Sequence, residues 1–331
     1  MSVYIIAEAG VNHNGRLDLA LKLCDAAKEA GVDAVKFQTW KTEKIVSKSA
    51  AKATYQEENT GKEQSQFEML KELELNYSEF DQINAYCKKI GIQFLSTPDE
   101  EESLDYLSSL NLPFLKIGSG EVTNIPYLRK IGYKHQNVIL STGMSTLSDV
   151  EKAYNTLLES GAKEVALLHC TTNYPCPYNE VNLLAMQTLK AAFKCQVGYS
   201  DHTMGIEVPI AAVALGAEII EKHFTLDKNM EGPDHKASLD PQELKQMVTS
   251  IRNIEKAMGD GIKRPNASEQ KNAEVVLKRI IASKSIKAGE ILGTENLTQL
   301  RSSEGIPVKF WDLIAGRPAM RDYKEDEPIE L

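Results

Sequence analysis

The sequence lacks a long apolar run, an excess of basic residues and any pair of cysteines at C-x-x-C spacing. No apolar stretch approaches the roughly 20 residues that a membrane-spanning helix needs, and the first residues, MSVYIIAEAG, lack the basic segment of a signal peptide. The net charge of −9 argues against a general nucleic-acid binder. Five scattered cysteines are typical of a reduced protein. We therefore expect a cytoplasmic protein that binds neither membrane nor nucleic acid.

The rest of the composition is that of an ordinary globular protein. The 331 residues are 42% hydrophobic and 26% charged. This length accommodates one large domain of roughly 250 residues and a small second one. An acidic chain can still hold a small anionic substrate in a locally basic pocket, so the net charge leaves that class of function open.

Eight short apolar or β-branched runs recur up to residue 224, separated by segments long enough for a helix. They read VYIIAEAG, DAVKFQT, IQFLSTP, PFLKIGSG, NVILSTG, EVALLHC, QVGYSDH and EIIEKHF. Strands that alternate with helices pair in parallel, and near-continuous apolar strands are buried on both faces. We therefore predict an α/β fold, a (β/α)8 TIM barrel. A doubly wound sheet uses the same alternation, but no G-x-G-x-x-G or P-loop pattern follows the first run.

Two intervening segments carry helix signals. The segment RLDLALKLCDAAKEAG has apolar residues at helical spacing and ends at Gly31. After the eighth run, Asp240 is a predicted N-cap, and Glu243 lies where a capping box requires it. Residues 41–65 are polar and lack a steady period. We predict that they form a long functional loop over the barrel mouth.

The pattern changes after the last of these helices. Residues 261–275 are polar and contain Pro265, which is typical of a linker. From residue 276 short strands and turns replace the strand–helix alternation. We therefore predict a barrel domain over 1–260, a linker over 261–275 and a small, mostly-β domain over 276–331, near the lower size limit for independent stability.

The predicted strand ends carry polar side chains, and active sites of TIM barrels form at these ends. His202 and His223 end the last two strands, and Glu8 ends the first, which adjoins the eighth in a closed barrel. Two imidazoles with oxygen ligands suit Mn²⁺, Fe²⁺, Co²⁺ or Zn²⁺. The alternative for each histidine is a hydrogen bond in the core. Glu221 and Lys222 flank His223, and we expect at least one of them to have a packing or supporting role.

Lys36 and Lys116 end the second and fourth strands. Lysines that point into a barrel mouth are costly unless an anion meets them. The segment KIGSGE over 116–121 adds glycines and a hydroxyl, a candidate phosphate cradle whose alternative is a tight turn. Together with Ser119, Ser141 and Ser200, the two lysines indicate a small phosphorylated, carboxylated substrate.

Eight motifs in the chain resemble, in order, those of the sialic acid synthase family. They are IIAEAGVNHNG, AVKFQT, STP, KIGSGE, LSTGM, LLHCTTNYP, GYSDHTMG and EKHFTLD…GPDHKASL. The C-terminal segment resembles the SAF, or type III antifreeze-like, domain of that family. The match covers nearly the whole chain, and GYSDH, EKHFTLD and GPDHKAS together are highly specific.

The resemblance implies a transferase that condenses phosphoenolpyruvate with an N-acylated mannose-type aldose and water, giving a nine-carbon 2-keto sugar acid and phosphate. It implies a domain-swapped homodimer and a divalent metal, Mn²⁺ before Mg²⁺ or Co²⁺. Carried over by motif, the metal ligands are His202 and His223, and the catalytic carboxylate is Glu8. The implied phosphoenolpyruvate site comprises Lys36, Thr97, Lys116, Ser119, Ser141 and Ser200. The implied sugar contacts are Tyr174, Asp234 and, from the partner chain, Arg301.

The sequence departs from the family at two of these motifs. CTTNYP leaves open whether Thr172 or Asn173 contacts phosphate, and RSSEGI replaces a more usual arginine motif after Arg301. NYPCPYNEVNL and GPDHKASLDPQEL are closer to the branch that makes N,N'-diacetyllegionaminate from 2,4-diacetamido-2,4,6-trideoxymannose. The alternatives are N-acetylneuraminate synthesis from N-acetylmannosamine, condensation onto a phosphorylated sugar, a metal-dependent aldolase or isomerase and, more remotely, a non-catalytic carbohydrate-binding protein.

Overall fold

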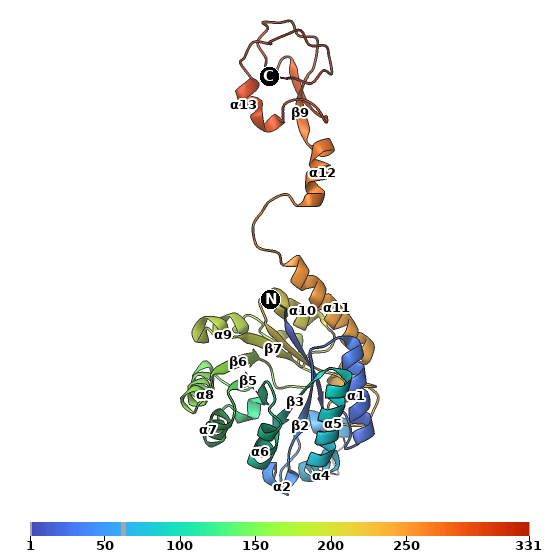
Figure 1. Cartoon of the computed structure of the whole chain (residues 1–331), viewed down its shortest axis with the longest axis vertical. Helices are drawn as coiled ribbons and strands as arrows, with labels where there is room; N and C mark the ends of the chain where they lie inside the picture. The colour runs from blue at the N-terminus through green and yellow to red at the C-terminus, as the bar shows by residue number, and fades with distance from the viewer. Residues whose placement is uncertain (1, 61–63, 331) are drawn as a thin grey trace. The chain divides into compact units, whose positions relative to one another are not determined.

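A computed structural model describes residues 2–60 and 64–330 of the chain. Its elements divide into two compact units, Met1–Gly259 and Asp260–Leu331. Among the described residues, no helix combines the length and the apolar character that crossing a bilayer requires. Figure 1 shows the first unit as a ring of strands enclosed by helices.

The first unit is built on eight parallel strands, as predicted. They are β1 (Tyr4–Gly10), β2 (Ala34–Thr39), β3 (Gln93–Pro98), β4 (Leu115–Ile117), β5 (Asn137–Ser141), β6 (Glu164–His169), β7 (Val197–Asp201) and β8 (Ile219–His223). Their order in the sheet is β3-β2-β1-β8-β7-β6-β5-β4, and β3 and β4 at its ends pack against each other. The sheet therefore curls into a barrel, as the (β/α)8 prediction requires.

Helices cover the outside of this barrel (Figure 1). They are α1 (Leu17–Ala30), α5 (Tyr77–Ile90), α6 (Glu101–Ser109), α7 (Ile125–Lys134), α8 (Leu147–Glu159), α9 (Ala185–Phe193), α10 (Glu207–Ala214) and α11 (Pro241–Ala257). The predicted stop of α1 is confirmed, since Gly31 takes the left-handed conformation with φ of 83°. The capping box of α11 between Asp240 and Glu243 is also present, and such a cap is worth about 1 kcal/mol.

The prediction of one long loop over 41–65 was wrong in part. Two short helices, α2 (Thr42–Ile45) and α3 (Thr54–Thr60), lie in it, α4 (Gln66–Leu73) follows, and residues 61–63 are outside the described residues. Helix α4 begins at a capping box between Ser65 and Glu68. The prediction of one long loop missed this signal because it relied on apolar periodicity, which residues 41–65 lack. The Asn59 amide donates to the Pro233 carbonyl at 2.7 Å, so α3 lies against the loop after β8.

The second unit has its own small core. Strands β9 (Lys278–Ala282) and β10 (Leu297–Arg301) pair antiparallel, and α13 (Trp311–Ile314) packs with them through Ile314. The segment 261–275 that the sequence indicates as a linker contains most of α12 (Ala267–Val276), a capped helix with no buried residue.

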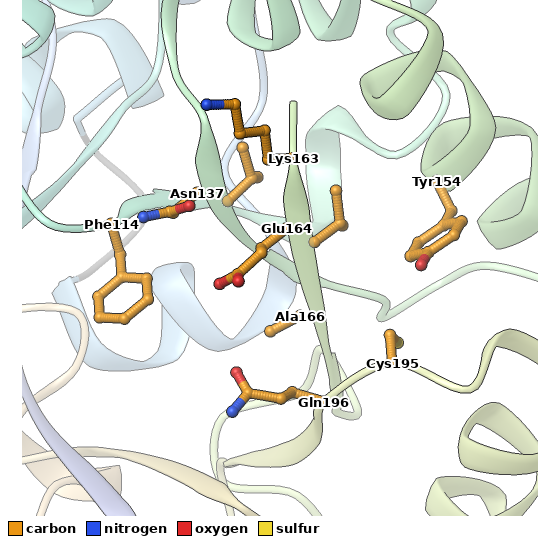
Figure 2. Close-up of a pocket in the computed structure, with 10 residues that line it drawn as sticks. Phe114, Asn137, Tyr154, Lys163, Glu164, Ala166, Cys195 and Gln196 are labelled. Atoms are coloured by element: carbon orange, nitrogen blue, oxygen red, sulfur yellow. The ribbon is translucent and has the colours of Figure 1, made fainter. Parts of the chain in front are cut away.

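A cavity of about 360 Å³ lies at the amino-terminal ends of β5–β7. Figure 2 shows it with Phe114 and Tyr154 on opposite sides and Glu164 and Gln196 between them. Its charged residues, Lys163 and Glu164, are exposed to solvent. These two charged side chains therefore lack the burial that tunes a group for chemistry.

Candidate active site at the carboxyl ends of the strands

The barrel interior changes from apolar to polar along each strand. Alternate residues of a strand face the same side, and a buried apolar layer inside the barrel includes Ile6, Ala34, Leu95, Ile139 and Ile219. The residues two positions later on the same strands are Glu8, Lys36, Thr97, Ser141 and Glu221. One further step brings β8 to His223. The fold thus gathers these side chains at one end of the barrel, above the apolar layer.

These side chains line one small cavity of about 90 Å³. Ten of the twelve residues that the sequence indicates for the site line it. They are Glu8, Lys36, Thr97, Lys116, Ser119, Ser141, Tyr174, Ser200, His202 and His223. The cavity is much smaller than the one in Figure 2, yet nearly all of its ionisable groups are buried.

Two lysines and two glutamates form a buried ionic network in the cavity. Lys36 Nζ lies 2.6 Å from Glu8 Oε2 and 3.8 Å from Glu221 Oε2, and it donates to Thr97 Oγ1 at 3.1 Å. Lys116 Nζ lies 3.3 Å from Glu221 Oε1, and Ser200 donates to the same oxygen at 3.0 Å. Glu221 therefore joins both lysines and one of the serines.

The network separates the pKa values of its two carboxyl groups. Burial raises the pKa of Glu8 well above its ordinary value, although the charge of Lys36 opposes that shift. Burial alone would also raise the pKa of Glu221, but the charges of Lys116 and Lys36 outweigh it and lower this pKa to about 2. Glu221 is therefore the ionised partner of the lysines, and Glu8 is suited to exchanging a proton near neutral pH.

Two histidine rings lie beside this network. Their centroids are 5.5 Å apart, and the Tyr174 ring lies 4.1 Å from that of His202. Burial lowers the pKa of both histidines, so the rings are neutral. His202 donates from Nδ1 to the Thr171 carbonyl at 2.6 Å, which leaves Nε2 with a free lone pair. His223 Nδ1 is buried and accepts no hydrogen bond from the residues described.

The carboxyl group of Glu8 lies close to the His223 ring. A Cβ atom placed on Gly10 would lie 3.2 Å from Glu8 Oε1 and 3.6 Å from His223 Cε1. Residues 2–60 and 64–330 contain no group of three or more His, Cys, Asp or Glu side chains arranged to hold a metal ion. A cation here would therefore have two imidazoles as protein ligands and take its other ligands from solvent or substrate.

Hydroxyl groups surround the lysine end of the cavity. Ser119 Oγ accepts a hydrogen bond from the Gly143 amide at 2.9 Å and lies 3.2 Å from Cys170 Sγ. The buried Ser141 and Thr172 hydroxyls have no hydrogen-bond partner among the described residues. A Cβ atom on Gly143 would lie 2.2 Å from Thr172 Oγ1. The Thr172 hydroxyl, one of the two phosphate contacts between which the sequence did not decide, therefore lies against the loop after β5, whose Gly143 amide donates to Ser119.

Two of the predicted site residues do not line the cavity. Asp234 is buried beside it, with Oδ2 3.8 Å from His223 Nδ1, and burial raises its pKa to about 6. Arg301 is the exposed last residue of β10, in the second unit. The role that the family resemblance implies for Arg301 stays a prediction.

Five residues that line the cavity were not among the predicted site residues, namely Gln38, Asp99, Gly118, Cys170 and Glu221, and two of them are acidic. Glu221 lies at the centre of the ionic network, and Asp99 lies two positions after Thr97. Burial raises the pKa of Asp99 to about 7 against the charge of Lys36. The alternation that places Ile219 and His223 inside the barrel places Glu221 there as well, and this signal was available in the sequence.

Comparison with known proteins matches this chain to two family models. Residues 23–263 match the NeuB family, and residues 279–331 match the SAF domain. The chain is 55% identical over 327 residues to N,N'-diacetyllegionaminic acid synthase of Campylobacter jejuni, covering 98% of each chain. It is 46% identical over 325 residues to the enzyme of the same name from Legionella pneumophila, covering 97% of this chain and 91% of that one.

A solved structure supports the same grouping. The N-acetylneuraminic acid synthetase of Leptospira borgpetersenii, in complex with citrate, superposes with a TM-score of 0.72 at 38% identity, covering 83% of this chain and 91% of that one. The resemblance seen in the motifs is thereby confirmed. The chain belongs to the NeuB family and carries a SAF domain over residues 279–331.

Proposed function

We propose that the protein condenses phosphoenolpyruvate with an N-acylated mannose-type aldose and water, forming a nine-carbon 2-keto sugar acid and phosphate. The observation that carries this proposal is the single buried cavity in which two lysines and a set of hydroxyls adjoin two neutral imidazoles and a carboxyl group of raised pKa. One side of the cavity is suited to a phosphate and the other to a reacting carbonyl.

The lysine side would bind phosphoenolpyruvate. Lys36 and Lys116 supply the positive charge, and Thr97, Ser119, Ser141 and Ser200 supply hydroxyls. The Ser141 hydroxyl has no hydrogen-bond partner in the part of the chain that the structure describes, and an oxygen of the substrate would use this capacity. Groups fixed by the barrel stabilise charge on the departing phosphate without reorganising during the reaction.

The two imidazoles fit a divalent cation. His202 Nε2 carries a lone pair because Nδ1 donates to the Thr171 carbonyl, and His223 Nδ1 has no hydrogen-bond partner among the described residues. The Thr171 carbonyl fixes the His202 tautomer as metal-site partners do. The preference for Mn²⁺ rests on the family resemblance, and oxygen ligands from solvent or substrate suit this ion. When bound, such a cation supplies Lewis acidity for the aldehyde of the sugar.

The bond changes of the proposed reaction balance without a redox step. The alkene carbon of phosphoenolpyruvate bonds to the aldehyde carbon, and water adds to the carbon that bears the phosphate. The C–O bond to phosphate then breaks, and phosphate leaves with the bridging oxygen while the hydroxyl that came from water loses its proton to the phosphate and becomes the ketone oxygen. Glu8 accepts the proton that the water loses and returns one to the sugar oxygen, a role for which its raised pKa is suited.

The preferred sugar is 2,4-diacetamido-2,4,6-trideoxymannose, giving N,N'-diacetyllegionaminate. This preference is supported by the similarity to the N,N'-diacetyllegionaminic acid synthases of Campylobacter and Legionella, and N-acetylmannosamine is the alternative that the similarity to the Leptospira N-acetylneuraminic acid synthetase supports. Tyr174 and Asp234, on the imidazole side, would contact the sugar. A homodimer in which Arg301 of one chain meets the N-acyl group in the other rests on family resemblance alone.

A phosphate-release assay tests the proposal. The purified protein is incubated with phosphoenolpyruvate, Mn²⁺ and each sugar in turn, and we expect release with the diacetamido sugar to exceed release with N-acetylmannosamine. No release with any N-acylated mannose would refute the synthase function and favour carbohydrate binding. In ¹⁸O-labelled water the released phosphate should stay unlabelled, because label in phosphate would mean cleavage of the P–O bond.

A further inference from the structure

Glu221 binds three residues that the proposed function assigns to phosphoenolpyruvate. Its carboxylate lies 3.3 Å from Lys116 Nζ and 3.8 Å from Lys36 Nζ, and it accepts a hydrogen bond from Ser200 at 3.0 Å. The side chain is buried, and its Oε2 atom has no hydrogen-bond partner in the described part of the chain. An incoming anion must therefore share these lysines and this serine with a charge that is already there.

We propose that Glu221 is the resident counter-ion of the phosphate subsite, and this inference rests on the proposed function. Without Glu221, Lys36 would keep the Glu8 carboxyl group at 2.6 Å, but Lys116 would lose the carboxylate that compensates its lost hydration and would repel the Lys36 ammonium. The Glu221 carboxylate removes that cost and fixes both Nζ atoms where phosphate is to bind. It acts through the lysines as a positioning residue.

The same contact limits how tightly phosphate is held. Phosphoenolpyruvate and inorganic phosphate are attracted by the lysines and repelled by Glu221. The Glu221 carboxylate therefore neutralises part of the lysine charge before either anion binds. Phosphate is also the product that must leave. A subsite without Glu221 would bind both anions more tightly. It would also release the product phosphate more slowly, because differences in affinity between related complexes arise mostly from differences in the dissociation rate.

The substitution Glu221→Gln tests this role, because it keeps the size of the side chain and an acceptor for Ser200 but removes the charge. The probe is inorganic phosphate, and the readouts are its dissociation constant and the thermal shift that it produces. We expect the variant to bind phosphate at least about tenfold more tightly, since a like charge a few ångströms from the anion is gone. Without phosphate it should melt below the wild type, and saturating phosphate should close most of that gap.

Kinetics separate this role from a merely structural one. In Glu221→Gln the KM for phosphoenolpyruvate and kcat should both fall, with stronger inhibition by phosphate, whereas simple damage to the site would raise KM. Glu218→Gln is the matched control, because it removes a carboxylate just before the same strand, and that carboxylate forms an ion pair with Lys190, which does not line the cavity. That control should leave phosphate affinity unchanged.

Three outcomes would overturn the inference. They are unchanged phosphate affinity in Glu221→Gln, weaker phosphate binding, and a variant that fails to fold even in phosphate, since the ligand would then be unable to replace the carboxylate. Failure of the proposed function looks different. If no sugar supports turnover but phosphate still binds more tightly to the variant, the synthase assignment fails while the role of Glu221 stands.

Discussion

Both faces of strand β8 carry buried ionisable side chains, but the two faces differ in whether the polar atoms of these side chains have hydrogen-bond partners. On the outer face, Lys222 contacts the Asp201 carboxylate and the Thr203 carbonyl, and the Thr203 amide and hydroxyl complete the shell of Asp201. On the inner face, Glu221 and His223 each retain a buried atom without a hydrogen-bond partner among the residues described.

This difference separates structure from chemistry on one strand. A buried ion pair whose hydrogen bonds are complete holds elements together, and breaking it costs stability. A buried group with unused bonding capacity costs stability in the folded state and is retained where a ligand uses it. Substitution of the inner-face histidine should therefore change turnover with little effect on folding. Glu221→Gln should lower stability chiefly in the absence of phosphate, and substitutions on the outer face should lower stability without changing turnover.

Removing both imidazoles should have the largest effect. The double substitution His202→Ala and His223→Ala should leave no cation-dependent phosphate release, because two of the ligands that would hold the metal are gone. Circular dichroism should show an intact barrel. His135→Ala, at the end of α7 and remote from the cavity, is the control. Full activity of the double variant in a chelator would eliminate the metal site.

Glu8, the group that we propose transfers the proton, comes next. In Glu8→Gln we expect kcat to fall roughly 10²- to 10⁴-fold, the range for loss of a general acid or base. The KM for phosphoenolpyruvate should change little, because the lysines retain Glu221 as their partner. Steady-state kinetics with both substrates varied measures this split. A kcat within tenfold of the wild type would assign the proton to another residue.

The sequence predicts the barrel and most of its site because both follow from short periods. Apolar runs separated by helical segments define the strands, and the last polar residue of each run lies at the barrel mouth. Considering only the last polar residue of each strand, and not which side of the barrel each residue faces, misses Glu221. The alternation along β8 places Glu221 inside the barrel together with His223. Which charges pair across strands depends on side-chain packing that no single strand encodes, and the placement of Arg301 depends on another unit of the chain.

The outer face of β8 should yield a loss of stability instead. Lys222→Met leaves the Asp201 carboxylate buried without its cation, which costs about 3–5 kcal/mol, a fall in melting temperature on the order of 10 °C for a barrel of this size. The folded fraction should keep the kcat of the wild type. Adding Asp201→Asn should recover part of the stability. If Lys222→Met melts normally but loses activity, the distinction between the two faces is wrong.

Asp99 should give the smallest effect, one that depends on pH. Its raised pKa of about 7 means that it is neutral below that pH and anionic above it, in a cavity where Lys36 and Lys116 attract it and Glu100 and Glu121 repel it. As pH rises through this value, the new negative charge should repel phosphoenolpyruvate and raise its KM several-fold. The KM for phosphoenolpyruvate is measured from about pH 6 to about pH 9, and in Asp99→Asn it should lack the part of the increase that ionisation of Asp99 causes. Asp105→Asn removes an exposed carboxylate of α6 that pairs with Lys134, and it should keep the full dependence. If Asp99→Asn also keeps it, Asp99 belongs with Lys222 among the residues whose role is to hold the fold.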